Sequence, residues 1–174
     1  ILTYGGRSFS IVDAEGNRVF DSADIIERIV ATQIPASFDD SRSDNKGPEP
    51  EGITVGTVGG RTYAFVALER SNATLIFDIT DPNAVTYTGM LQTDGDIAPE
   101  GVIFISAEDS PNGKSLAVVS HEESNTVTVY ELNDAPDFTS PTMFTRPEND
   151  VTVGTVTATD PEDNPITFAL AGGA

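Results

Sequence analysis

Pro50-Glu51-Gly52-Ile53 and Pro99-Glu100-Gly101-Val102 are two copies of one short motif, and they lie 49 residues apart. We call this motif the corner. Each copy opens a run of short segments in which apolar and polar residues alternate, a pattern typical of β-strands. A fixed period near fifty residues is typical of β-propeller blades, which are four-stranded sheets arranged around a channel. The repeat therefore predicts an all-β chain that contains part of a β-propeller.

The alternating segments are separated by turn residues, which place the expected strands. After the first corner the pattern predicts strands at 53–58, 62–68, 74–79 and 85–91, and after the second at 102–106, 115–120 and 126–131. Two earlier segments, 8–12 and 18–21, are expected to be outer strands of a preceding blade. The chain thus holds two to three blades, fewer than the four or so that typically close a ring.

One short helix is predicted near residues 23–34. Its apolar residues recur at helical spacing before Pro35: Ile25, Ile26, Ile29, Val30 and Ile34. Ser22 precedes them at a position that favours an N-cap. From 36 to 50 the chain is polar, and loops of that length are usually functional or disordered.

Composition limits the classes of partner. With 28 acidic and nine basic residues, the formal net charge is -19, which disfavours nucleic acids and anionic membranes. Cations are the natural partners of such a surface, although the same charge also serves solubility. The chain has no cysteine, so disulfides and thiol chemistry are absent. No apolar run is long enough for membrane insertion.

The pattern changes after residue 132, which predicts three parts. Residues 1–132 would be the C-terminal blades of the propeller, 133–146 a linker, and 147–174 the beginning of an incomplete β-sandwich domain. The chain begins and ends in mid-pattern, which indicates a piece of a longer protein. Its expected partners are other domains of that protein, or a second copy bound through open blade edges.

The tail carries Asn133-Asp134-Ala135-Pro136, Pro147-Glu148-Asn149 and a segment from Gly154 to Pro161 that reads Gly-Thr-Val-Thr-Ala-Thr-Asp-Pro. It resembles the opening of a bacterial cadherin-like domain, with strands expected at 151–159 and 166–170. The resemblance implies calcium ligands at these positions: Asn133, Asp134, Glu148, Asp160 and Glu162. Glu162 departs from the family, which has Asp there. Alternatively, these side chains only form turns and caps.

The blades also resemble a known family, through residues 39–52, 60–66, 77–82 and 106–114. They are similar to the end of the choice-of-anchor I propellers, extracellular bacterial proteins with some alkaline-phosphatase-like relatives. This resemblance implies a secreted or surface-held scaffold. It does not by itself imply an enzyme, because fold-level likeness is weak support for an activity.

The alternative function is part of an extracellular metal-dependent phosphoesterase. Carboxylates from several loops would then hold a divalent ion that activates water, with Arg42 or Lys46 facing phosphate. The candidate ligands are Asp39, Asp40, Asp44, Glu49, Glu51 and Glu100. A Glu repeated at blade corners has a structural explanation too, as an acceptor of backbone N–H bonds. The single histidine, His121, gives little support to a catalytic triad, and a third alternative is a calcium-binding spacer.

Overall fold

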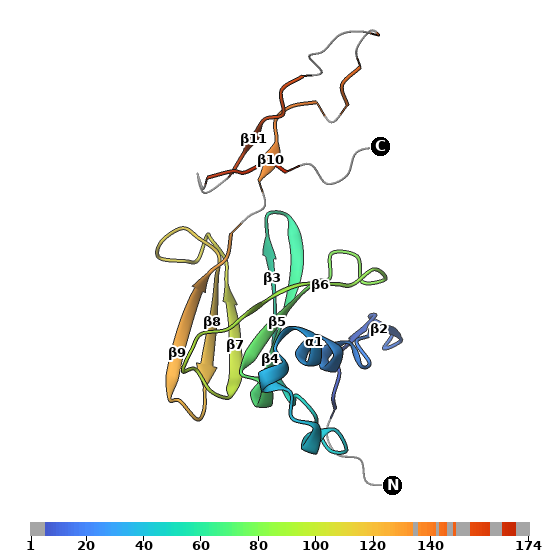
Figure 1. Cartoon of the computed structure of the whole chain (residues 1–174), viewed down its shortest axis with the longest axis vertical. Helices are drawn as coiled ribbons and strands as arrows, with labels where there is room; N and C mark the ends of the chain where they lie inside the picture. Colours follow the sequence, from blue (N-terminus) through green and yellow to red (C-terminus); the bar gives the residue numbers. More distant parts are fainter. Residues whose placement is uncertain are drawn as a thin grey trace. The chain divides into compact units, whose positions relative to one another are not determined.

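The computed structural model describes residues 6–133, 136–141, 143–145, 148, 154–160 and 165–169 (Figure 1). The chain divides into two compact units, Ile1–Leu132 and Asn133–Ala174. The described residues are mostly β, with antiparallel sheets and one α-helix. The expected all-β class is confirmed at this level. The described sheets do not close into a ring, and the propeller stays a prediction.

Two sheets correspond to the two copies of the corner. The first contains, in this order, β3 (Pro50–Val58), β4 (Arg61–Leu68), β5 (Ala73–Asp78) and β6 (Thr86–Leu91). The second contains β7 (Pro99–Ile105), β8 (Leu116–His121) and β9 (Thr126–Glu131). All neighbours are antiparallel, and every strand overlaps its predicted range.

Each corner begins with a residue in the left-handed conformation, directly before its proline. The φ angle is 59° at Glu49 and 61° at Ala98. The pairing register then shifts within Pro50–Ile53 and within Pro99–Gly101. Such a bulge bends the strand and increases its twist. The two corners therefore share a backbone geometry as well as a sequence.

A second repeated turn follows the next strand of each sheet, and the sequence analysis did not identify it. Glu69-Arg70-Ser71-Asn72 follows β4, and Glu122-Glu123-Ser124-Asn125 follows β8. The two Asn residues have φ of 50° and 56°, a conformation that Asn tolerates better than most residues. The Glu69 N–H donates to the carbonyl of Glu49 at 3.0 Å, and that of Glu122 to Ala98 at 2.8 Å. Each turn is thus bonded to its own corner.

The β3–β6 sheet is covered on both faces by different parts of the first unit. One face packs against α1 (Ile25–Gln33) and the hairpin of β1 (Ser10–Val12) and β2 (Arg18–Asp21). That core contains Phe9, Ile26, Val30, Leu68, Leu75 and Phe77. The other face packs against the β7–β9 sheet through Phe65, Ala67, Val102, Ala117 and Val119. Figure 1 shows α1 and the β7–β9 sheet on opposite sides of β4 and β5.

The two sheets approach each other most closely where β3 meets β7. A Cβ atom added to Gly52 would collide with the backbone carbonyl of Glu100. One added to Gly56 would collide with the ring of Phe104. Glycine at these two places therefore lets the inner strands of the sheets lie against one another.

The predicted helix is confirmed, but Ser22 does not cap it. The N-cap residue is Asp24, and no side chain caps the helix there. Ser22 is fully buried, and its hydroxyl accepts the Phe9 N–H at 3.0 Å. The Ser22 side chain thus connects the segment before β1 to the start of the helix. It bonds there and does not cap the helix, because a buried N–H needs a partner more than an exposed helix end does.

The polar segment from 36 to 49 has more local structure than its sequence indicated. It contains short 3₁₀ helices at Pro35–Ser37 and Asp40–Arg42. Successive backbone bonds continue this turn structure, including Gly47 N–H to Arg42 O at 3.0 Å. Polar residues form such turns without burying apolar surface. The segment is consequently an ordered loop that precedes the first corner.

In the second unit, β10 (Asp137–Phe138) pairs with β11 (Ala158–Thr159). The predicted strand at 151–159 is wrong in its length, because residues 154–157 are not in a strand and 151–153 lie outside the described residues. The strand expected at 166–170 is absent from its described part, residues 166–169. Short apolar segments form strands only where a partner strand lies alongside. In the described part of the chain, no helix is long and apolar enough to cross a membrane.

Candidate functional site

Glu49 is a buried carboxylate at the first corner, and three cationic side chains surround it. The residue is 3% exposed. One carboxylate oxygen accepts from Lys46 Nζ, and the other accepts from Arg42 Nη2 and from Arg70 Nε at 3.2 Å. Arg42 and Lys46 come from the ordered loop, whereas Arg70 comes from the turn after β4. The carboxylate therefore joins the loop to the sheet.

Arg70 extends the ion-pair network to the second sheet. Besides Glu49, its guanidinium contacts Glu69 at 2.6 Å and Glu123 at 3.2 Å. Glu123 belongs to the repeated turn after β8, so this last pair crosses between the sheets. We call Arg42, Lys46, Glu49, Glu69, Arg70 and Glu123 the corner network.

Burial and charge act differently on the two acids of the network. Burial raises the pKa of Glu49, but hydrogen bonds from Lys46 and Arg70 outweigh it, so this pKa lies below its ordinary value. Burial also raises the pKa of Glu69; Arg70 only partly offsets the increase, and repulsion from Glu49 and Glu51 adds to it. Glu49 is thus held ionised, while Glu69 resists ionisation.

Glu49, Glu51 and Glu69 are also the group of carboxylates that most resembles a metal site. In the described part of the chain, one oxygen of each lies within 4.8 Å of the others. Three donors are fewer than the six to eight oxygens that calcium takes. The oxygens of Glu49 already accept from arginine and lysine, so a divalent ion would have to displace those cations. The geometry supports an ion-pair network better than a metal centre.

The other predicted divalent ligands lie apart from this group. Asp39 accepts from the Ser41 N–H at 2.9 Å, and Asp40 accepts from the Ser43 hydroxyl at 3.0 Å, so both stabilise loop turns. Asp44 lies on the same loop, and Glu100 is exposed at the second corner. Their role as metal ligands stays a prediction. Glu69, which the sequence analysis did not nominate, belongs to the group instead, and the repeated Glu-x-Ser-Asn turn was the signal for it.

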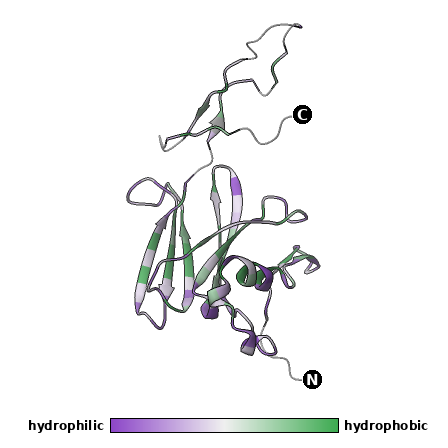
Figure 2. Cartoon of the chain, in the orientation of Figure 1, coloured by the Kyte–Doolittle hydropathy of each residue, from purple (hydrophilic) through white to green (hydrophobic). Residues whose placement is uncertain are grey.

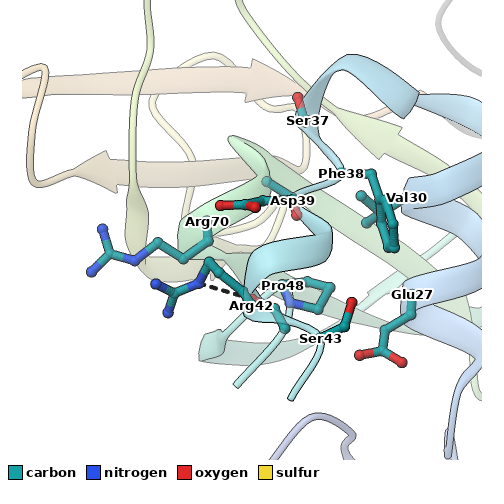
Figure 3. Close-up of a pocket in the computed structure, with 11 residues that line it drawn as sticks. Glu27, Val30, Ser37, Phe38, Asp39, Arg42, Ser43, Pro48 and Arg70 are labelled. Carbon is teal, nitrogen blue, oxygen red and sulfur yellow. Dashed lines mark hydrogen bonds between the residues drawn. The ribbon is translucent and has the colours of Figure 1, made fainter. Parts of the chain in front are cut away.

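A hollow beside the corner network is lined by α1, the loop and the turn after β4 (Figure 3). Val30 and Phe38 line its apolar side, and the side chains of Arg42 and Arg70 extend in the same direction from neighbouring turns. Both guanidinium groups are already paired with Glu49. The charged groups of the hollow therefore hold the loop in place.

His121 lies at the end of β8 beside a buried acid. Its side chain is 5% exposed, and Nδ1 stands 3.9 Å from Asp96 Oδ2. In the described residues Nδ1 has no hydrogen-bond partner, whereas Asp96 accepts from the hydroxyls of Thr126 and Thr128. In the repeat, His121 takes the place of Leu68, because they pair with Pro99 and Pro50 respectively. It thus occupies a packing position.

The predicted calcium ligands of the tail are only partly described. Asp134 and Glu162 lie outside the described residues, and Glu148 is exposed. Asp160 is buried and directly follows β11, whose Thr159 pairs with Asp137 of β10. Asp160 therefore lies directly beyond the end of the β10–β11 pair, and Asn133 lies four residues before β10 in the sequence. Asparagine and carboxylate oxygens are donors that calcium accepts.

The shifted carboxylate pKa values predict how stability depends on pH. The pKa values of Glu49, Asp78 and Asp96 lie below their ordinary values, so their ionised forms stabilise the fold at neutral pH. That contribution is lost as the pH falls below about 4. Glu69 contributes to stability in the opposite direction. Because its pKa is raised, protonation of Glu69 at a pH near or just above the ordinary pKa of 4.5 stabilises the fold. Thermal unfolding midpoints should rise slightly from pH 7 to 5 and fall steeply below 4.

Glu69→Gln is the matched variant for this prediction. It should remove the slight rise and keep the steep acid loss. A midpoint that increases steadily down to pH 3 would show that the paired carboxylates do not stabilise the folded state.

Comparison with known proteins gives a family similarity over the first half of the chain. The model of the choice-of-anchor I domain matches residues 1–82. The resemblance to that family is thereby confirmed over those residues. The cadherin-like resemblance of the tail stays a prediction. No solved structure matches the chain significantly.

Two curated proteins are similar to most of the chain. Gigasin-3a of Magallana gigas is 29% identical over 163 residues, which cover 76% of this chain and 57% of that protein. The mesenchyme-specific cell surface glycoprotein of Strongylocentrotus purpuratus is 29% identical over 159 residues, which cover 78% of this chain and 19% of that protein. The chain therefore spans between about a fifth and about three fifths of these relatives.

Proposed function

We propose that the chain is a non-catalytic scaffold segment of a secreted or cell-surface protein, built from blade-like sheets of a β-propeller. The observation that carries this proposal is the corner network, in which a buried carboxylate is bound by three cations from the loop and the next turn. Its ion pairs connect the loop before β3 to the turn after β4, which is a structural role. A surface location is supported by the similarity to a protein named as a cell surface glycoprotein.

The stacked sheets support the propeller part of the proposal. Both start from the same left-handed corner, and the inner strands β3 and β7 lie against each other. Sheets that repeat in this way bury a continuous core between neighbours. The chain's partners would be the other domains of its parent protein. The expected bacterial origin stays a prediction.

We further propose that calcium stiffens the tail after residue 132. The support is the buried Asp160, which directly follows β11, together with Asn133 and Glu148 as further oxygen donors in the same part of the sequence. These are hard oxygen ligands, which suit calcium and not softer metals. Asp134 and Glu162 would complete the set.

The test combines thermal unfolding with an activity assay on the whole chain. Millimolar calcium should raise the unfolding midpoint by a few degrees, because an ion that binds only the folded state stabilises it. Asp160→Asn should abolish the rise, and Glu69→Gln should keep it. A chromogenic phosphate ester should not be hydrolysed with calcium, magnesium or zinc.

The alternative, part of a metal-dependent phosphoesterase, rests on the grouping of Glu49, Glu51 and Glu69. It predicts turnover that a chelator abolishes and that Glu69→Gln removes. That outcome would overturn the scaffold proposal. A calcium effect lost in Glu69→Gln but kept in Asp160→Asn would instead move the ion from the tail to the corner.

A further inference from the structure

The outer face of the β7–β9 sheet is apolar and exposed. Ile103, Val127 and Val129 are 56%, 66% and 57% exposed, and one comes from β7 and two from β9. Figure 2 shows apolar residues along these strands. Ala117 and Val119 of β8 belong to the opposite, buried face. We call Ile103, Val118, Val127 and Val129 the outer face.

The repeat shows what covers such a face, because the first sheet has the same positions. Counting from the two left-handed Asn residues, Val127 corresponds to Thr74 and Val129 to Ile76. Thr74 is 2% exposed, and Ile76 packs in the core between the two sheets. In the first sheet, the second sheet covers these two positions. In the second sheet, the equivalent positions are therefore exposed.

The corner turns show the same difference. Asn72 Oδ1 accepts the N–H of Ala98, the left-handed residue of the next corner, at 3.0 Å. Asn125 holds the same place and the same conformation one repeat later. Its Nδ2 donates to Glu123 O at 3.3 Å, but in the described residues its Oδ1 accepts no hydrogen bond. Asn125, the equivalent of the Asn72 that links the two sheets, thus has no following corner to bind among the described residues.

On the opposite side of the array, α1 and the β1–β2 hairpin cover β4 and β5, but part of β3 is exposed. Val102 and Phe104 of β7 pack between the two sheets, yet their counterparts on β3, Ile53 and Val55, are each 54% exposed. The exposed side of β3 therefore corresponds to the side of β7 that is buried between the two sheets. Surfaces that differ in this way join head to tail.

We propose that the outer face seats a further antiparallel sheet of the same repeat, supplied by a part of the protein outside residues 1–174. Its residue before the corner proline would donate its N–H to Asn125 Oδ1, as Ala98 does to Asn72. This inference rests on the proposed scaffold of blade-like sheets. The relatives have room for such a sheet, since this chain spans 57% and 19% of them.

A second copy of this chain fits the outer face less well. In this chain, the surface that packs on Thr74 and Ile76 contains Val102 and Val119. In a second copy, Val102 and Val119 are already buried against that copy's own first sheet. A copy would therefore have to open its own core before it bound. A further sheet whose equivalent surface is not yet buried could bind without opening a core.

The experiment supplies the missing sheet in the same chain. Residues 92–132 are inserted a second time after Leu132, and the original Val127 is replaced by cysteine in both this tandem chain and the 174-residue chain. Because residues 1–174 contain no cysteine, maleimide reports position 127 alone in these two chains. Labelling should be about tenfold slower in the tandem chain, since a seated sheet must open before the thiol reacts. Glu108→Cys on an exposed loop is the control and should react equally in both.

Asn125→Gly provides a second, independent measurement, and Asn72→Gly is its matched control. Glycine keeps the left-handed conformation, so each variant removes only the side chain. Asn72→Gly should lower the unfolding midpoint of both chains by about 2–4 °C. Asn125→Gly should do so only in the tandem chain. Should the tandem chain not fold, labelling of the Val127→Cys variant is compared between the 174-residue chain and the natural full-length protein.

Equal labelling at position 127 in the short and the extended protein would overturn the inference. So would a 174-residue chain that dimerises in light scattering and protects the thiol of Val127→Cys, because the occupant would then be a second copy. Neither result depends on phosphate-ester turnover or on calcium, so failure of this inference is distinct from failure of the proposed function.

Discussion

Glu49→Gln should lower the free energy of unfolding by about 2–4 kcal/mol, measured by urea denaturation followed by circular dichroism. The substitution removes the charge that Arg42, Lys46 and Arg70 share, and removal of one partner from a buried ion pair typically costs about 3–5 kcal/mol. The expected loss is somewhat smaller because the cationic side chains are 27% to 42% exposed and keep part of their hydration.

Glu51→Gln and Glu69→Gln are the matched controls, since both acids lie in the same group of carboxylates. Each should change the free energy of unfolding by less than about 1 kcal/mol. Glu51 is exposed, and burial opposes the charge of Glu69, which offsets part of what the variant loses in pairing with Arg70. If Glu49→Gln were as stable as these two controls, the ion pairs of Glu49 would not stabilise the fold.

Gly52→Ala should lower the free energy of unfolding by about 1–3 kcal/mol, the usual cost of overpacking. The added methyl group would meet the backbone carbonyl of Glu100, which no side-chain rotation can move away. The inner strands β3 and β7 would therefore have to separate, and the core between the two sheets would loosen.

Gly89→Ala is the control for this effect. Gly89 lies on β6 with open space around it, and its backbone suits any residue, so alanine should leave stability unchanged or raise it by up to about 1 kcal/mol. Equal effects at Gly52 and Gly89 would mean that the sheets do not pack closely at the corner.

The strands and the helix were predictable because their signals are local. Alternation placed β3 to β9, and the stripe of Ile26, Ile29 and Val30 placed α1. The spacing of the two Pro-Glu-Gly corners also predicted that the sheets repeat. These features depend on neighbouring residues and on a period that is visible in the chain.

The site was less predictable because it is assembled from segments far apart in the sequence. Glu49 and Glu51 were nominated as metal ligands, but nothing in the sequence showed that Arg70, 21 residues later, would reach Glu49. The role of Ser22 was mistaken for a similar reason, since its partner Phe9 lies 13 residues earlier. The tail strands failed because pairing decides whether a short apolar segment forms a strand.

The stacking of two repeated sheets into one cooperative unit is the central claim, and native-state hydrogen exchange tests it most directly. Amides of β4 and β8 should exchange with the same free energy of opening, because Phe65, Ala67, Ala117 and Val119 share one core. Gly52→Ala should lower both values together. A β8 that exchanges far more readily than β4, with Gly52→Ala affecting only one of them, would contradict the account.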